Sequence, residues 1–510
     1  MAKHYDVVVL GGSLGALATA ALLARRSWRV LVLGQGYRRS LYGFEGHTLA
    51  RRLFTFVSYT SPVWSRVIIE LAQSQAFRKR VMALDPMFQV LGKRLRLDVP
   101  PDAELFGTYV ERVFPGSRRI VDELYMELAR TNASADAAFE CDAVWPPGTF
   151  WERRETERIA ETLPHLDDGE VPSFLAQFPR DHGYRALVEV PAVFASHATN
   201  FPSFALARLH GAFTRGLVRL ARGEDEVVDF LVDRIRAHGG QVELGEQAVR
   251  IAVKAGRVTG VLREGEARAV GANFLVSSLS TRGVVDLAPE FPLPRRVFAG
   301  LPELFAREFR FVLSAVVRNE GLAEPLGHEA FLLPDDARLP RVHLTRGTGS
   351  EPGTSLLVAE ALFPDGTAVP VVRARQVVLD MVAGVLPYLE QHLVLVDSPH
   401  DGLPLWDYRT VPQGQRLEVE RAVLRSGGAS LEAEPMVARW LVEPFHFHGL
   451  GAEPLRTPLG GAFIVGPTVL PALGQEGELL AAWSVARLIT RTDRAREKMR
   501  RELWSRVEIG

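Results

Sequence analysis

The stretch YDVVVLGGSLGALATAALLARRSWRVLVLGQG, from Tyr5 to Gly36, decides the fold of this chain. It begins with three consecutive valines, turns at Gly11, Gly12 and Ser13, and continues as an Ala/Leu-rich run before a second short apolar run. A strand, a glycine turn, a helix and a second strand within about thirty residues form the βαβ unit that opens dinucleotide-binding folds. Both strands are apolar, which predicts that they are buried on both faces of a parallel sheet.

The uncharged run from Val7 to Ala24 is also just long enough to suggest a membrane-spanning helix. The glycine turn interrupts this run. The valines before the turn favour a strand, and the Ala/Leu run after it favours a helix. We therefore expect a strand, a turn and a helix, and not a membrane span.

The turn carries an altered form of the G-x-G-x-x-G pattern, whose three glycines make the turn, admit the pyrophosphate and let the helix pack close to the strand. Gly11, Ser13 and Ala16 occupy these three places. The Cβ of Ser13 would lie where phosphate oxygens approach, and Gly34, near the end of the second strand, lacks the carboxylate that holds ribose hydroxyls. These residues alone leave two interpretations open: a nucleotide site with weakened contacts, or a βαβ scaffold without a nucleotide.

Composition limits the functions that this chain of 510 residues can have. Its length suggests two or three domain-sized units. A balance of 60 basic and 61 acidic residues gives a formal net charge of -1, which argues against nucleic-acid binding. The single cysteine, Cys141, excludes an intramolecular disulfide framework and fits a reducing compartment. The first residues lack the features of a signal peptide, so we expect a cytoplasmic protein.

Two further blocks complete the pattern that the first stretch begins. Residues His238 to Ser278 predict two strands, a turn near Gly256 and two more strands, and Thr457 to Ile489 predict a buried strand, a Gly/Pro loop and an Ala-rich helix. Together the three blocks resemble the pieces of the discontinuous FAD domain in the phytoene desaturase and amine oxidase superfamily. The segment from Pro86 to Tyr125 resembles the desaturase branch in particular.

The resemblance implies an α/β fold with two parts and a terminal extension. The first part is a discontinuous FAD-type Rossmann domain, with a parallel sheet, helices and a small β-meander, and the second is a mixed-sheet α+β domain for a substrate or partner. The expected bounds are residues 1–50, 215–290 and 456–495 for the first domain, 51–214 and 291–455 for the second, and 496–510 for a basic helical end.

The resemblance also implies which residues would contact FAD. The pyrophosphate loop would be Gly11, Gly12, Ser13, Leu14 and Gly15, the backbone contact to adenine would be at Val249, and the flavin side would be lined by Gly466, Gly474 and Gly477. Three residues depart from the family pattern, namely Ser13, Gly34 and Pro467. Pro467 departs from it because a proline cannot donate the backbone hydrogen bond expected at that position. If each departure removes one contact, the combined loss reaches several kcal/mol.

Two functions follow from these observations. The first is an FAD-dependent oxidoreductase resembling phytoene desaturases, in which a long, apolar, isoprenoid-like substrate passes a hydride to the flavin. Such chemistry needs few protein acids or bases, so no catalytic residue is predicted. The second is a cofactor-free relative that binds a lipid or a protein partner, since Rab GDP-dissociation inhibitors and escort proteins resemble this superfamily and lack flavin.

Other polar motifs favour structural roles. His446 and His448 would share one face of a strand, a spacing that can ligate zinc, but no cluster of metal ligands accompanies them, so we predict no metal site. His400 and Asp401 have the composition of a turn. The acidic run from Glu224 to Glu226 fits the first turn of a helix.

Two apolar or basic segments leave alternatives open. The stretch from Phe54 to Leu84 predicts a helix pair that either packs in the core or covers an apolar tunnel. The stretch from Arg487 to Gly510 predicts a basic helix that either packs on its own domain or lies on an anionic membrane surface.

Overall fold

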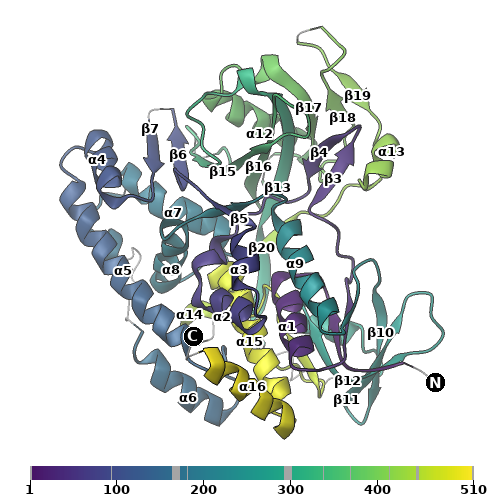
Figure 1. The fold of residues 1–510 in the computed structure, drawn as a ribbon. Helices are drawn as coiled ribbons and strands as arrows, with labels where there is room; N and C mark the ends of the chain where they lie inside the picture. Colours follow the sequence, from purple (N-terminus) through teal and green to yellow (C-terminus); the bar gives the residue numbers. More distant parts are fainter. Residues whose placement is uncertain are drawn as a thin grey trace.

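The computed structural model describes residues 3–93, 95–163, 173–180, 182–291, 301–336, 338–367, 369–412, 414–443 and 447–507. Two sheets organise the chain, one above the other in Figure 1, with helices beside them.

The first sheet contains the βαβ unit that the sequence predicts. Its strands are β1 (His4–Leu10), β2 (Val30–Leu33), β9 (Gln241–Glu243), β10 (Ala248–Lys254), β11 (Arg257–Arg263), β12 (Val270–Ser277) and β21 (Ala462–Ile464). The strand order is β10-β11-β12-β1-β2-β9, and β21 also pairs with β12. The pairs that β1 makes with β2 and β12 are parallel, whereas β10, β11 and β12 form an antiparallel meander. All residues of β1 after the first, and all of β2, are buried, which confirms that both faces are covered.

Three helices cover this sheet and come from both ends and the middle of the chain. They are α1 (Leu14–Arg25), α9 (Glu224–Ala237) and α15 (Gly474–Thr490). α1 packs against both of the others. Because every residue of α15 is buried except Gln475, its apolar sequence is explained by packing on all sides.

The second sheet is larger and mostly antiparallel. Its strands are β6 (Phe88–Gly92), β7 (Leu95–Val99), β13 (Glu303–Arg318), β14 (Glu329–Leu332), β15 (Val342–Thr348), β16 (Thr354–Pro364), β17 (Leu393–Asp397), β18 (Leu405–Asp407), β19 (Leu417–Val419) and β20 (Val437–Glu443). The order is β19-β18-β17-β13-β16-β15-β14-β6-β7, with β20 also paired to β13. β14 and β6 run parallel, so the sheet is mixed. The predicted α/β fold with a second, mixed-sheet part is confirmed.

The remaining helices surround the two sheets, with α4 and α5 along one side and α6 and α16 at the lower end of the molecule in Figure 1. They are α2 (Pro62–Glu70), α3 (Ser74–Arg78), α4 (Ala103–Val113), α5 (Arg118–Glu140), α6 (Phe150–Ala160), α7 (Gly183–Ala195), α8 (Ser203–Thr214), α10 (Thr281–Asp286), α12 (Val371–Val385), α13 (Arg421–Leu424), α14 (Phe447–Leu450) and α16 (Arg494–Val507). In α2 and α3, Trp64 and Phe77 are fully buried with ring centroids 4.9 Å apart. The predicted helix pair is therefore core packing.

Two small two-stranded sheets lie outside the main sheets, one a hairpin and one a pair of strands that are distant in sequence. They pair β3 (Leu41–Phe44) with β4 (His47–Ala50), and β5 (Val81–Ala83) with β8 (Val218–Leu220). Tyr42, Phe44 and Leu49 of the hairpin share a hydrophobic cluster with Val394 and Leu395 of the second sheet. This hairpin, which ends at the expected domain boundary at residue 50, therefore packs on the second sheet.

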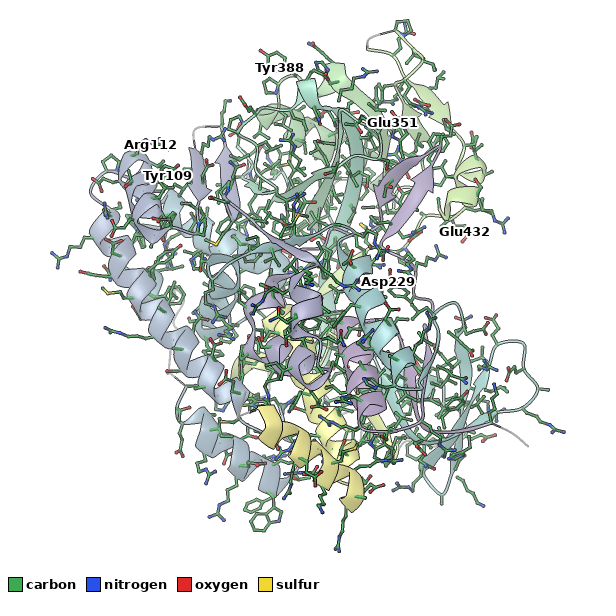
Figure 2. The ribbon with its side chains drawn as sticks, in the orientation of Figure 1. Tyr109, Arg112, Asp229, Glu351, Tyr388 and Glu432 are labelled. Atoms are coloured by element: carbon green, nitrogen blue, oxygen red, sulfur yellow. The ribbon has the colours of Figure 1, made fainter. Side chains whose placement is uncertain are left out.

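Acidic residues in and after the first turn of α9 bind the segment from Arg39 to Arg52, which crosses from the first sheet to the second. Glu224 binds Arg52 at 2.7 Å, and the carboxylate of Asp225 accepts the backbone N–H of Ser40 at 2.9 Å. Asp229, labelled in Figure 2, binds Arg39 at 2.5 Å. The predicted position of the acidic run at the start of a helix is confirmed, and its carboxylates also hold the crossing segment.

The basic C-terminal helix, α16, packs on its own domain. Arg500 is buried and contacts both carboxylate oxygens of Asp142 at about 3 Å. The guanidinium of Arg496 lies 3.9 Å from the centroid of the Trp28 ring. These contacts use arginines that a membrane surface would otherwise attract. Within the described ranges, none of the helices has both the length and the apolar character needed to cross a bilayer.

Candidate functional site

The turn between β1 and α1 forms as the sequence predicts. Gly11 has a φ of 114°, and a Cβ there would overlap the hydroxyl of Ser278, so glycine is required. Ser13 is the N-cap of α1, and its hydroxyl accepts the N–H of Ala16 at 3.3 Å. The carbonyl of Ser13 accepts the N–H of Leu17 at 3.0 Å. Two early amides of the helix therefore have partners within the helix itself.

A carboxylate from the far end of the chain accepts a hydrogen bond from the amide of Gly15, just before the two amides described above. The N–H of Gly15 donates to Oε2 of Glu478, in the first turns of α15, at 3.2 Å. Glu478 is buried, and its Oε1 lies 3.3 Å from Nε2 of His197. Helix N-termini attract anions because their amides are unpaired and the helix dipole is positive there. Here the anion is a side chain of the protein.

A tyrosine covers the neighbouring glycine. A Cβ at Gly12 would overlap the ring of Tyr37, so the aromatic ring lies directly against the loop. Burial, assisted by Glu224, raises the pKa of Tyr37, which keeps its hydroxyl neutral. The guanidinium of Arg52 lies 5.6 Å from the ring centroid on this side of the loop.

The end of β2 is closed by the chain before β10. A Cβ at Gly34 would overlap the carbonyl oxygen of Leu244, so no acidic side chain fits at this position. The side-chain amide of Gln35 donates to the carbonyl of Ala248 and accepts its N–H, each at 2.9 Å. Val249, predicted to contact adenine through its backbone, is the next residue, and its side chain is largely exposed.

The three C-terminal glycines predicted to line the flavin side pack against backbone. A Cβ at Gly466 would overlap the carbonyl oxygen of Ser278, one at Gly474 that of Ala195, and one at Gly477 that of Leu470. Close packing therefore explains these glycines without a ligand, and their contact with flavin stays a prediction. Pro467 lies in the same loop as Gly466 and offers no N–H.

The residues present do not fit a bound dinucleotide in this arrangement. The Gly15 amide holds a carboxylate, and the Gly12 face holds an aromatic ring. A dinucleotide would have to displace the side chains of Glu478 and Tyr37.

A cavity of about 210 Å³ lies between this loop and the second sheet. Ser13 and Leu14 border it on one side, and His343, Glu360 and Val312 border it on the other. This volume is below the roughly 300–1,000 Å³ of pockets that enclose drug-sized ligands.

Two histidines that the sequence analysis did not connect line this cavity. Nε2 of His343 lies 2.6 Å from Oε2 of the buried Glu329, which also accepts the hydroxyl of Thr55. Nδ1 of His400 lies 3.0 Å from the carbonyl oxygen of Glu434. His400 belongs to the segment predicted as a turn, and its separation from His343 along the chain gives no signal that the two side chains meet.

Two buried charge networks were also missed from the sequence. Glu476, in the first turn of α15, accepts two hydrogen bonds from Arg208 at 2.6 and 2.7 Å. Burial would raise the pKa of Glu476, but Arg208 lowers it below its usual value. In the second domain, the fully buried Arg375 binds both carboxylate oxygens of Asp401 at 2.7 Å, with Asp397 at 3.3 Å. Both networks pair every charge, as burial requires.

The predicted strand position of the histidine pair is wrong for His448. It follows β20 in a left-handed turn, with a φ of 53°, while His446 lies outside the described residues. Among the described residues, no cluster of three or more His, Cys, Asp or Glu side chains could hold a metal ion.

Solved structures share this fold. An oxidoreductase from Methanosarcina mazei is 16% identical, with 94% of this chain and 100% of that chain covered and a TM-score of 0.59. A putrescine oxidase variant, from a redesign of cofactor binding, is 14% identical, with 96% and 100% covered and a TM-score of 0.57. The PF1083 protein from Pyrococcus furiosus is 14% identical, with 95% and 97% covered and a TM-score of 0.54.

At these identities the likeness shows the fold alone, and this fold matches that of FAD-dependent oxidoreductases. No family model and no curated protein sequence matches the chain.

Proposed function

We propose that this chain is a cofactor-free, ligand-binding protein with the fold of FAD-type oxidoreductases. Its own side chains close the dinucleotide cleft, and the cavity that remains between the sheets binds a small molecule. The observation that carries the proposal is the hydrogen bond from the Gly15 N–H to Glu478.

Electrostatics support this assignment. Two unit charges 4 Å apart interact by about 4 kcal/mol at the effective dielectric constant typical of protein sites, so a phosphate beside the Glu478 carboxylate is strongly repelled. Displacing Glu478 would leave a buried carboxylate without its amide donor, which costs about 1–3 kcal/mol or more. Replacing the Glu478 contact by a dinucleotide phosphate is therefore unfavourable in free energy at this position.

A flavin titration tests the proposal. The purified protein should be colourless after gel filtration, and FAD fluorescence should show no saturable quenching when the protein is added. Flavin retained at one molecule per chain, or saturable binding at micromolar concentration, would contradict it.

A flavin-dependent oxidoreductase is the second candidate. Two observations favour it: the fold likeness extends over nearly the whole chain, and the buried hydroxyl of Tyr37 has no hydrogen-bond partner among the described residues. A bound flavin would supply hydride acceptance. The desaturase-like version further needs room for a long isoprenoid, so the cavity of about 210 Å³ would have to open. Stoichiometric flavin in the titration would favour this candidate.

A further inference from the structure

Side chains from three neighbouring strands of the second sheet form one side of the cavity. Glu360 on β16 is the direct neighbour of His343 on β15 and of Val312 on β13, so all three side chains share one face of the sheet. Arg310, two residues before Val312, lies on the same face. All four residues line the cavity.

The charged groups around the cavity are paired with protein groups. Arg310 binds Glu360 and the carbonyl oxygens of Phe194 and Ser196. Arg52 binds Glu224, and Glu478 is held by Gly15 and His197. A charged ligand would therefore have to break an existing pair.

His343 lines the cavity and uses only one of its ring nitrogens in a hydrogen bond within the described part of the chain. Its Nε2 donates to the Glu329 carboxylate at 2.6 Å, and its ring stacks on Phe331 with centroids 4.3 Å apart. The ring orientation is therefore fixed from two sides. This leaves Nδ1, which has no hydrogen-bond partner in the described part of the chain, although the residue is only 2% exposed.

His400 likewise uses only one ring nitrogen in a hydrogen bond among the described residues. Burial lowers the pKa of His400, so the ring is neutral at physiological pH. Because Nδ1–H donates to the carbonyl of Glu434 at 3.0 Å, Nε2 carries the lone pair. His400 also lines the cavity. Three imidazoles line the cavity, and Nε2 of the third, from His197, lies 3.3 Å from the Glu478 carboxylate. His343 and His400 each keep one ring nitrogen without a hydrogen-bond partner among the described residues.

Apolar side chains form a large part of the wall, and the size of the cavity limits the ligand. The apolar residues include Leu53, Phe54, Val57, Phe194 and Phe213, while Arg51, Thr55 and Gln475 add polar groups. An apolar protein cavity of about 150 Å³ is enough to bind benzene. A cavity of about 210 Å³ accommodates one six-membered ring with one or two further heavy atoms.

We infer that this cavity binds a small, uncharged, single-ring molecule that carries a hydroxyl group, and that the hydroxyl donates a hydrogen bond to His343 or His400. The inference rests on the proposed ligand-binding function and names the chemical class of its ligand.

Phenol and toluene are the matched probes, because they share shape and differ in the hydroxyl. Isothermal titration should give phenol an affinity about five- to tenfold above that of toluene, the value of one neutral hydrogen bond. In His343→Phe and in His400→Phe the phenol preference should fall by at least about threefold, with toluene affinity changed less. His400→Phe leaves the Glu329–His343 pair intact, so it tests the site even if His343→Phe does not fold. His238→Phe, far from the cavity, should retain the preference.

Equal affinity for phenol and toluene in the unsubstituted protein, or no binding of either at millimolar concentration, overturns the inference. So does a phenol preference that survives both cavity substitutions. The flavin titration separates this result from the proposed function: a protein without flavin and without phenol preference refutes only the ligand class. A protein that retains flavin and still prefers phenol refutes only the cofactor-free assignment.

Discussion

Replacing Glu478 by alanine should increase the affinity of this protein for nucleotide phosphates. The carboxylate holds the Gly15 amide at 3.2 Å, and a hydrogen bond with one charged partner contributes about 1.5–3 kcal/mol. Removing this competitor should therefore improve binding of FAD or ADP by about tenfold to a hundredfold. Fluorescence quenching of FAD, measured at equal protein concentrations, gives the ratio directly. Adding Tyr37→Ala should increase the affinity again, because its ring lies against Gly12 of the loop.

Glu246→Ala is the matched control, since Glu246 is an exposed glutamate near the same edge of the first sheet. It removes the same charge without freeing an amide of α1, so its affinity for FAD should stay within about twofold of the unsubstituted protein. Unchanged or weaker FAD binding in a folded Glu478→Ala protein would refute the argument that this carboxylate closes the cleft. Thermal melting of each variant establishes that it is folded.

Three further predictions concern stability. Arg375→Met should lower the free energy of unfolding by about 3–5 kcal/mol in urea titrations, because it leaves the buried Asp401 without its bidentate partner and removes one of the two guanidinium partners of Asp397. Arg373→Met, at an exposed position of the same helix, should change the free energy of unfolding little, and equal effects would contradict the network's role. Burial alone would raise the pKa of Glu152, but Arg456 and the amides of Gly148 and Thr149 hold that pKa at about 2. The ionised carboxylate therefore stabilises the folded protein fully at pH values above the unfolded pKa of about 4.3. This stabilisation is lost as the pH falls towards 2. Glu152→Gln should flatten the acid limb of stability between these values, and the exposed Glu157→Gln should not. Gly34→Asp should lower the free energy of unfolding by about 1–3 kcal/mol without creating a ribose site, because its Cβ would overlap the carbonyl oxygen of Leu244. Gly245→Asp is the control, because no atom lies within 4 Å of a Cβ added there, and it should leave the thermal melting of the protein nearly unchanged.

Local patterns in the sequence were sufficient to predict the βαβ unit. The valines of β1, the glycine turn and the Ala/Leu run of α1 lie in one continuous stretch, and each has a strong preference for the structure that it forms. The meander around Gly256 and the helix from Gly474 are similarly local. The contact of the hairpin from Leu41 to Ala50 with the second sheet could not be predicted in this way, because its partners, such as Val394, are distant in sequence.

The closure of the cleft could not be predicted in the same way. Gly15 and Glu478 are 463 positions apart, and Gln35 and Ala248 are 213 positions apart. One signal was nevertheless present. Glu476 and Glu478 are acids in an otherwise apolar helix, and buried carboxylates require partners, so both positions indicated polar contacts with other parts of the chain.

The last strand and the last helix of the first sheet are synthesised long after its first strand and helix. β21 and α15, which pack on β12 and α1, begin at residues 462 and 474 and are therefore synthesised more than 400 residues after α1. At a translation rate of about 5–20 residues per second, the apolar βαβ unit waits for roughly 25–100 s before its last neighbours arrive. Throughout this interval its valine and leucine surfaces are incompletely covered, so newly made chains should depend on chaperones, and truncation before residue 462 should yield aggregated protein.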